Sequence, residues 1–379
     1  MLIVIATAIV AVAIAALGAA QPGTTPPPPM PCRLEDFETL FPLREYKGHY
    51  IVNLVRHKAT NVPYALKKGC KWIAKESDPN HVRLSFADRD ALLLHLRGTP
   101  GVVRAFCTMQ DADYACILME YLPGGNLYVR CPSFPTTAPE HLVKFYVAST
   151  VLVLEKVHQK GMFYSLLNPE NVFVDAKGYI RIVDFSTSRF FPRGHKLCFF
   201  QGKLEFASPE MVKTLGALEY FQGIGLPRRY AGYDQISDIW ALGIFVCALF
   251  VGTTPFAIHD IQYESPEQWA AVVACAILST PEPDIPVPSA LPPLAQNFVR
   301  SLLRHSPRKR PKFDQIKTHA WFRGFDWGAL AAGIMKAPYE PARHLSGPFD
   351  RMNFMQVRHP RHPVPPPPRP KRNRAWDDF

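Results

Sequence analysis

Alternating apolar and polar positions mark the first part of the chain that can fold. Residues 46–68 (YKGHYIVNLVRHKATNVPYALKK) contain two such segments around a turn at 59–62, and residues 102–121 contain two more around 110–113. A period of two predicts half-buried β-strands joined as hairpins. Residues 86–96 (FADRDALLLHL) have the spacing of an amphipathic helix instead. The pattern predicts a small antiparallel sheet accompanied by a helix.

Longer apolar segments dominate the second part. Residues 139–159 and 238–252 are apolar over helical lengths. Between them, the short apolar segments 172–174 and 179–183 flank a turn at 177–178, which predicts a β-hairpin. A strand-rich part followed by a mainly helical part indicates an α+β fold. The chain has 379 residues, 47% of them hydrophobic, which suits one large or two modest domains with a buried core.

The predicted hairpin has a polar side chain at each mouth. Asn171 precedes its first strand, and Asp184 follows its second strand. A hairpin brings two such positions together, and carboxylate and amide oxygens are suitable ligands for Mg²⁺ on a phosphate. We therefore expect Asn171 and Asp184 to be metal ligands.

The residues around this hairpin resemble the catalytic and metal-binding loops of protein kinases. Residues 164–171 read YSLLNPEN and residues 184–186 read DFS, where the family normally has Tyr/His-Arg-Asp-Leu-Lys-Pro-Glu-Asn and Asp-Phe-Gly. Residues 207–210 (ASPE) match the family's Ala-Pro-Glu anchor. The resemblance implies a bilobal protein-kinase fold, with a small antiparallel β lobe and a large, mainly helical lobe.

The resemblance also sets the expected domain boundaries. We expect a kinase domain over 33–325, an AGC-type C-terminal tail over 326–379, and an insertion of unknown role at 213–236. The small lobe would occupy residues 33–120, the large lobe residues 125–325, and a Pro-rich linker residues 21–32.

Three departures from the family pattern fall in the catalytic loop. Leu166 stands at the position of the base that accepts the substrate proton, and a leucine cannot accept a proton. Ser165 replaces the arginine that reads an activation-loop phosphate, and Asn168 replaces the lysine that steadies the transferring phosphate. We expect a catalytically impaired protein, a pseudokinase that acts by binding or scaffolding in kinase signalling. The alternative is a weak or atypical ATP-dependent Ser/Thr kinase, because loss of a general base costs about 10²–10⁴ in rate.

Nucleotide-binding residues follow from the same resemblance. The string Ala65-Leu66-Lys67 matches the family's Ala-x-Lys, and Asp90 is the expected ion-pair partner of Lys67. The other cofactor-binding residues that we expect are Glu120 and Leu122 at the hinge and Glu170 in the catalytic loop.

The phosphate-covering loop departs from the family. Its three glycine positions are Glu45, Lys47 and Tyr50. Side chains block close approach of the backbone to a phosphate, and Glu45 adds a negative charge. We therefore expect ATP and Mg²⁺ to bind weakly.

Other matches concern the architecture. The resemblance implies that Asp238 holds the backbone of the catalytic loop and that Glu210 pairs with Arg310. It also implies that Tyr164 and Phe185 stack beside each other in the closed fold.

The C-terminal segment resembles the tail of AGC-type kinases. Trp376 and Phe379 resemble the hydrophobic motif that docks on the small lobe, most closely that of the cyclic-AMP-dependent protein kinase catalytic subunit. The Pro/Arg-rich segment 358–374 is expected to be extended polyproline II. Residues 365–372 fit an SH3-ligand pattern, and a stiff linker is the alternative.

The N-terminal residues 2–20 are almost purely apolar. They fit a signal peptide cut after Ala20, and they are also long enough for a membrane anchor. An uncut anchor would leave the kinase domain in the cytosol, since the basic residues lie downstream. A start at Met30 would give a cytoplasmic protein, so the location stays open.

Net charge and cysteine content indicate less about the function. The net charge is +11, and the basic excess in the tail suits either a solvated tail or an acidic or membrane surface. Eight cysteines lack metal or framework spacing, which favours reduced core residues, although Cys107 and Cys116 could bridge across a hairpin. The expected partner is a protein (a kinase, a regulatory subunit or a scaffold), with a membrane as a second partner of residues 2–20 and no nucleic acid.

Overall fold

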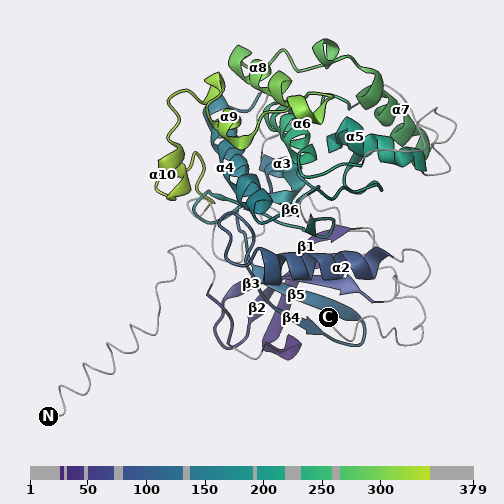
Figure 1. Cartoon of the computed structure of the whole chain (residues 1–379). Coiled ribbons are helices and arrows are strands. Elements are labelled where there is room, and N and C mark those ends of the chain that lie inside the picture. Colours follow the sequence, from purple (N-terminus) through teal and green to yellow (C-terminus); the bar gives the residue numbers. More distant parts are fainter. Residues whose placement is uncertain are drawn as a thin grey trace.

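Two lobes are stacked on each other in the computed structural model of the chain (Figure 1). The structure describes residues 26–29, 32–46, 50–71, 80–130, 137–190, 194–217, 232–257 and 265–341. One lobe is built mainly of antiparallel strands and the other mainly of helices. The predicted α+β, bilobal fold is therefore confirmed.

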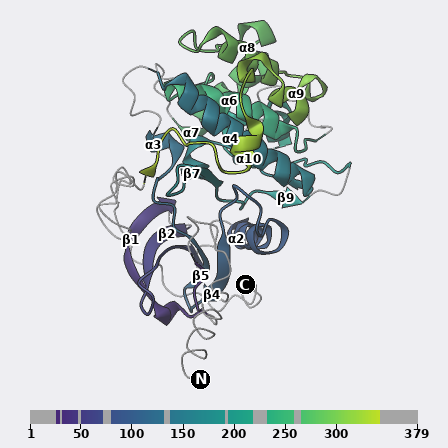
Figure 2. The ribbon, with the colours of Figure 1, turned by 90° about the vertical axis from the view of Figure 1, so that its left-hand side faces the viewer.

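The small lobe is a five-stranded sheet in the order β1-β2-β3-β5-β4. Each neighbouring pair in it is antiparallel. One helix and a π-helical continuation lie beside the sheet (Figure 2). Ala91 and Leu92 of the continuation belong to the main core, and Leu93 packs against it. The elements are β1 (Phe37–Tyr46), β2 (Tyr50–His57), β3 (Pro63–Cys70), α2 (Asn80–Asp90) with its continuation Ala91–His95, β4 (Ala105–Gln110) and β5 (Tyr114–Glu120).

Both faces of this sheet bury apolar side chains. One face joins the main core of the molecule. The other face holds a separate cluster around Phe37, Tyr64 and Leu118. The hydroxyl of Tyr64 donates a 2.8 Å hydrogen bond to the carbonyl of Pro26, so the Pro-rich segment reaches this outer face.

The large lobe is organised around α6 (Ser237–Val251), whose side chains are almost all buried. A helix that is apolar on every side is suited to such a position, because it has no polar face to present to water. The other helices are α3 (Leu127–Arg130), α4 (Glu140–Gln159), α5 (Pro209–Val212), α7 (Pro266–Ser279), α8 (Pro293–Leu302), α9 (Phe313–Lys317) and α10 (Trp327–Ala331).

Two small strand pairs lie at the junction of the lobes. β6 (Met162–Phe163) pairs with β9 (Arg189–Phe190), and β7 (Val172–Val174) pairs with β8 (Ile180–Ile182). The second pair is the hairpin that the sequence predicts. Gly178 in its turn has φ +88°, and a Cβ there would lie 1.9 Å from the carbonyl oxygen of Tyr339, so no side chain fits.

The alternative of a bridge between Cys107 and Cys116 is wrong, and the favoured reduced state of the two cysteines holds. Cys107 lies opposite Leu118, and Cys116 lies opposite Met109. The register that the hairpin turn sets at Gln110 and Ala115 continues to Cys107, so the two cysteines are not cross-strand neighbours. Neither Cys107 nor Cys116 forms a disulfide, and the other cysteines among the described residues form none either.

Several predictions concern segments outside the described residues. These are the apolar segment 2–20, most of the insertion 213–236, the Pro/Arg-rich segment 358–374, and Trp376 with Phe379. Within the described ranges, no helix combines the length and apolar composition that a bilayer crossing requires.

Candidate functional site

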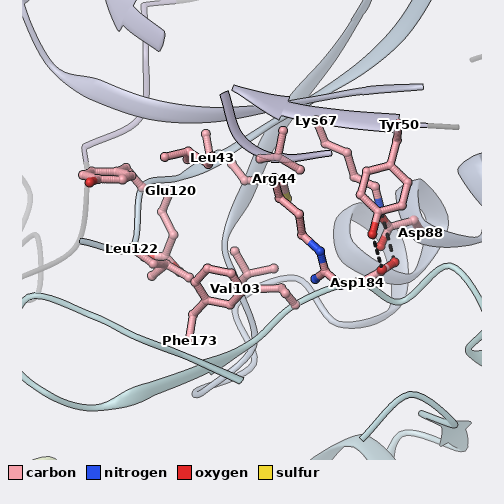
Figure 3. A pocket seen from close by; sticks show the side chains of 15 residues that line it. Leu43, Arg44, Tyr50, Lys67, Asp88, Val103, Glu120, Leu122, Phe173 and Asp184 are labelled. Atoms are coloured by element: carbon pink, nitrogen blue, oxygen red, sulfur yellow. Dashed lines mark hydrogen bonds and ion pairs between the residues drawn. The ribbon is translucent and has the colours of Figure 1, made fainter. Parts of the chain in front are cut away.

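A cleft lies between the sheet of the small lobe and the β7–β8 hairpin of the large lobe (Figure 3). Its cavity has a volume of about 60 Å³, whereas ligand pockets usually measure about 300–1,000 Å³. Apolar side chains line one part of the cleft, and charged side chains line the other part. The lining includes Leu43, Arg44, Tyr50, Val52, Ala65, Lys67, Asp88, Val103, Met119, Glu120, Tyr121, Leu122, Phe173, Val183 and Asp184.

Lys67 is the central cation of the charged part. It extends from β3, and its Nζ lies 2.7 Å from Asp88 Oδ2 and 3.1 Å from Asp184 Oδ1. The expected pair with Asp90 is therefore wrong. Asp90 binds its neighbour Arg89 at 2.7 Å and its side chain is 37% exposed, whereas the Asp88 side chain is 1% exposed. The partner of the buried lysine is an aspartate two positions earlier in α2.

Asp88 also connects α2 to the metal-binding loop. Its Oδ1 accepts a 2.7 Å hydrogen bond from the backbone N–H of Phe185. Burial raises the pKa of Asp88, although Lys67 opposes this. Burial alone would also raise the pKa of Asp184, but Lys67 and Arg44 outweigh it and lower the pKa to about 2. The pKa of Asp184 therefore lies below that of an ordinary aspartate.

Arg44 enters the cleft from β1. Its Nη1 donates a 2.9 Å hydrogen bond to Asn171 Oδ1, and its Nη2 lies 3.3 Å from Glu170 Oε2. Leu43 and Arg44 both line the cleft, although neighbouring side chains in a regular strand point to opposite faces. The register of β1 against β2 shifts between Pro42 and Arg44. Such a bulge re-aims a side chain, which explains how both residues face the cavity.

Tyr50, the first residue of β2, closes the charged part from above. Its hydroxyl donates a 3.2 Å hydrogen bond to Asp184 Oδ2, and its ring lies over Lys67, 4.4 Å from Nζ. Figure 3 shows Tyr50, Lys67, Asp88 and Asp184 grouped together, with Arg44 reaching down beside them. Burial and the nearby Asp184 raise the pKa of the Tyr50 hydroxyl, so it remains a donor.

The two expected metal ligands are both at the cleft, but their oxygens already have partners. Asn171 Oδ1 accepts from Arg44, and the Asn171 amide donates to the carbonyl of Leu166 at 3.2 Å. Asp184 accepts from Lys67 on one oxygen and from Tyr50 on the other. No group of three or more acidic, His or Cys side chains arranged to hold a metal occurs among the described residues. This arrangement does not fit a divalent ion.

The other expected nucleotide residues are distributed unevenly. Ala65 and Leu122 line the apolar part of the cleft. Glu120 also lines it, but its carboxylate accepts from the backbone N–H of Arg104 at 2.8 Å and pairs with Arg181 at 3.3 Å. The side chain of Glu120 therefore connects the hinge to Arg104 and Arg181.

The catalytic loop contains no group that could accept a proton at position 166. Leu166 is half-buried and packs against the main core. Asn168 is buried, and its amide donates to the carbonyl of Leu166 at 2.8 Å while its oxygen accepts from the N–H of Glu170 at 3.0 Å. The residue that replaces the family lysine thus satisfies the backbone of its own loop.

Glu170 is shared between two cations. Besides Arg44, it pairs with Lys203 of the activation segment, whose Nζ lies 3.0 Å from Oε1. The carboxylate therefore connects β1, the catalytic loop and the activation segment. This arrangement leaves it fully partnered by the chain itself.

The architectural predictions agree with the contacts. Asp238 accepts the backbone N–H of Tyr164 at 3.0 Å and that of Ser165 at 2.9 Å. Arg310 makes a paired contact with Glu210, at 2.7 Å on Oε2. The rings of Tyr164 and Phe185 lie 4.9 Å apart.

Ser165 has a role that the sequence does not reveal. It adopts φ +66°, and its hydroxyl lies 2.7 Å from that of Thr187. The carbonyl of Thr187 accepts from Gln201 in the activation segment. The residue that replaces the phosphate-reading arginine therefore fastens the segment through neutral hydrogen bonds.

Arg44 and Asp88 are the two site residues that sequence reasoning missed. Arg44 lies in an alternating strand, where only the bulge turns it inward. The sequence could locate Asp88 only by counting residues back from the strands that follow α2. This count is uncertain by a few residues, because the length of the connection between the helix and the next strand varies.

Two lobes that meet at a lysine–aspartate pair, above a hairpin carrying Asn171 and Asp184, define a protein-kinase-like cleft. A family model for the protein kinase domain matches residues 48–322. The chain belongs to the protein kinase family. Domains of this family bind ATP and Mg²⁺.

Curated relatives are protein kinases of much greater length. The chain is 29% identical to the cGMP-dependent protein kinase egl-4 of Caenorhabditis elegans, over 76% of this chain and 33% of that protein. It is 29% identical to serine/threonine-protein kinase N3 of Mus musculus, over 86% and 34%. It is 30% identical to serine/threonine-protein kinase MRCK gamma of Homo sapiens, over 80% and 18%. The chain thus matches about a third or less of each relative's length.

Proposed function

We propose that this chain is a pseudokinase of AGC type, which regulates a protein partner by binding and does not transfer phosphate. The half-buried Leu166 at the base position carries this proposal. A hydroxyl nucleophile needs a nearby acceptor for its proton in this type of reaction, and a hydrocarbon side chain offers none.

The neighbouring side chains support the same reading. Asn168 is occupied with its own loop, and Glu170 is held by Arg44 and Lys203. A carboxylate with two cationic partners is poorly available to an arginine of a substrate peptide. The proposed protein would bind ATP weakly, because Arg44 and Tyr50 take up the charged part of the cleft.

The partner that we propose is a protein: an active kinase, a regulatory subunit or a scaffold. Residues 365–372, with their SH3-ligand pattern, are a second candidate contact. Deletion of residues 358–374 distinguishes the two, because binding to the folded lobes would persist and binding through the Pro/Arg segment would be lost.

The test is a phosphotransfer assay on the full chain with labelled ATP, basic and acidic peptides, and either Mg²⁺ or Mn²⁺. We expect no incorporation above that of the Asp184→Ala variant. Incorporation that exceeds this variant, after purification that removes contaminating kinases, would refute the proposal.

A weak kinase is the second candidate, and one observation favours it. Lys67 keeps its contacts with Asp88 and, across the cleft, with Asp184, as a nucleotide-binding lysine of this family would. This candidate predicts slow autophosphorylation that disappears in Lys67→Met. Lack of autophosphorylation with either metal would exclude it.

A further inference from the structure

The acidic side chains in and beside the charged part of the cleft all have cationic partners. Lys67 pairs with Asp88 and Asp184, Arg44 and Lys203 pair with Glu170, and Lys203 also lies 3.8 Å from Glu205. Each of these carboxylates therefore already contacts a cation. A divalent ion added to this group would introduce two positive charges for which no carboxylate is free.

We infer that Arg44 is the built-in cation of this cleft and takes the place of a divalent metal, so that the cleft binds its ligands without metal. This inference deepens the proposed function, on which it rests, by stating what kind of ligand the site accepts. It concerns the described residues of β1, the catalytic loop and the metal-binding loop.

Contacts with Asn171 support the inference first. Arg44 Nη1 donates to Asn171 Oδ1 at 2.9 Å and to the carbonyl of Glu170 at 3.4 Å. The Asn171 amide nitrogen donates to the carbonyl of Leu166 and offers no lone pair. A metal at the second lone pair of Oδ1 would lie next to the positive guanidinium of Arg44, which repels it.

Contacts with Asp184 give independent support. Its Oδ1 accepts from Lys67 at 3.1 Å and from the backbone N–H of Ser186 at 3.4 Å, and its Oδ2 accepts from Tyr50 at 3.2 Å. Asp184 has φ +59°, a backbone conformation that is uncommon for a residue with a side chain. The protein itself thus supplies three hydrogen-bond donors to this carboxylate.

The guanidinium is also well retained. An arginine is charged at any physiological pH, and the guanidinium of Arg44 lies 3.3 Å from the carboxylate of Glu170. Its side chain is 23% exposed. Removal of Arg44 would leave Asn171 without this donor and Glu170 with Lys203 alone, next to Asp184.

The test measures Mn²⁺ binding to the full chain by electron paramagnetic resonance, which needs no catalytic activity. We expect no saturable site in the unmodified chain. Arg44→Ala should gain a site, with affinity at least about tenfold tighter than any residual binding, because oxygen ligands then become available. Arg56→Ala is the matched control, since Arg56 lies on neighbouring β2 and pairs with Glu38 away from the cleft.

A saturable Mn²⁺ site of equal affinity in the unmodified chain and in Arg44→Ala would overturn the inference. Far-UV circular dichroism checks that the variant is folded. If Arg44→Ala does not fold, Arg44→Lys provides the second test. A lysine cannot contact Asn171 and Glu170 through two separate nitrogens as Arg44 does, so Mn²⁺ should bind more tightly to Arg44→Lys than to the unmodified chain.

A second measurement concerns the ligand. The thermal shift of the unmodified chain with ATP should be the same in EDTA and in Mg²⁺, and in Arg44→Ala it should depend on Mg²⁺. A Mg²⁺-dependent shift in the unmodified chain would contradict the inference while leaving the absence of phosphotransfer untouched. Phosphotransfer by a chain that binds no Mn²⁺ would instead contradict the proposed function.

Discussion

The amino group of Lys67 lies 2.7 Å from Asp88 and joins strand β3 to helix α2. Asp90, two residues further along, pairs only with Arg89 among the ion pairs recorded for the described residues. Asp88 also accepts a hydrogen bond from the backbone N–H of Phe185. The same carboxylate therefore connects the small lobe to the metal-binding loop.

We predict that Asp88→Asn destabilises the protein far more than Asp90→Asn. Removing one partner of a buried ion pair typically costs about 3–5 kcal/mol, because the other charge stays buried. A substitution on the surface usually changes stability by about 0.5 kcal/mol or less. Urea unfolding of the two variants gives the comparison, and equal midpoints would refute the assignment of Asp88 as the partner.

The pair Glu210–Arg310 should make stability depend on acid. Burial opposes the charge of Glu210, but the hydrogen bonds and charge of Arg310 outweigh burial and lower the pKa of Glu210 below its usual 4.5. The folded state therefore binds fewer protons than the unfolded state near this pH. The stabilisation is complete above pH 4.5 and is lost as the pH falls through the lowered pKa.

Glu210→Gln tests this prediction. At neutral pH the variant should lose about 3–5 kcal/mol, because the buried Arg310 loses its partner. Its stability should also fall less steeply than that of the unmodified chain as the pH is lowered from 4.5. Urea titrations at several pH values measure the free energy of unfolding of both proteins. If it falls equally with pH in Glu210→Gln and in the unmodified chain, Glu210 does not cause the acid dependence.

Ser165→Ala should loosen the activation segment. The hydroxyl of Ser165 contacts the hydroxyl and the carbonyl of Thr187, at 2.7 and 3.1 Å. Loss of these contacts should cost about 1 kcal/mol and increase proteolytic cleavage within residues 194–217. Ser279→Ala removes an exposed hydroxyl that bonds only within its own helix, so it should leave cleavage unchanged. Equal cleavage of the two variants would contradict the role of Ser165.

Restoring the family's catalytic residues should not suffice for activity. Leu166→Asp with Asn168→Lys supplies a base and a phosphate-binding cation, yet Arg44 still binds Asn171. We expect phosphotransfer only after Arg44→Ala is added, with a gain of about 10²-fold or more if the new base acts. Activity of the double variant that matches the triple variant would show that Arg44 does not limit the site.

Residues whose position depends on neighbouring elements of the chain could be predicted from the sequence. The hairpin between 172 and 183 brings Asn171 and Asp184 together because two short strands and a glycine turn are adjacent in the sequence. Asp238, Glu210 and Arg310 stand at fixed places relative to long apolar elements, so their partners follow once the family is recognised. These are the relationships that the contacts confirm.

Asp88 could not be identified in this way. Two residues along an α-helix are separated by about 200° around its axis, so a counting difference of two positions exchanges the buried face for the exposed one. The sequence offers two aspartates, Asp88 and Asp90, and only packing of α2 against the sheet selects between them.

The amino-acid sequence by itself determined the pair of oxygen side chains at the hairpin, because that pair depends on residue type and local spacing. Through the resemblance of its motifs to a known family, it also determined the two-lobed fold and the missing base at Leu166. The tertiary structure decided what those oxygens bind. A bulge in β1 turns Arg44 into the cleft, and a bulge depends on how one strand pairs with the next, which the alternation of apolar and polar residues does not specify.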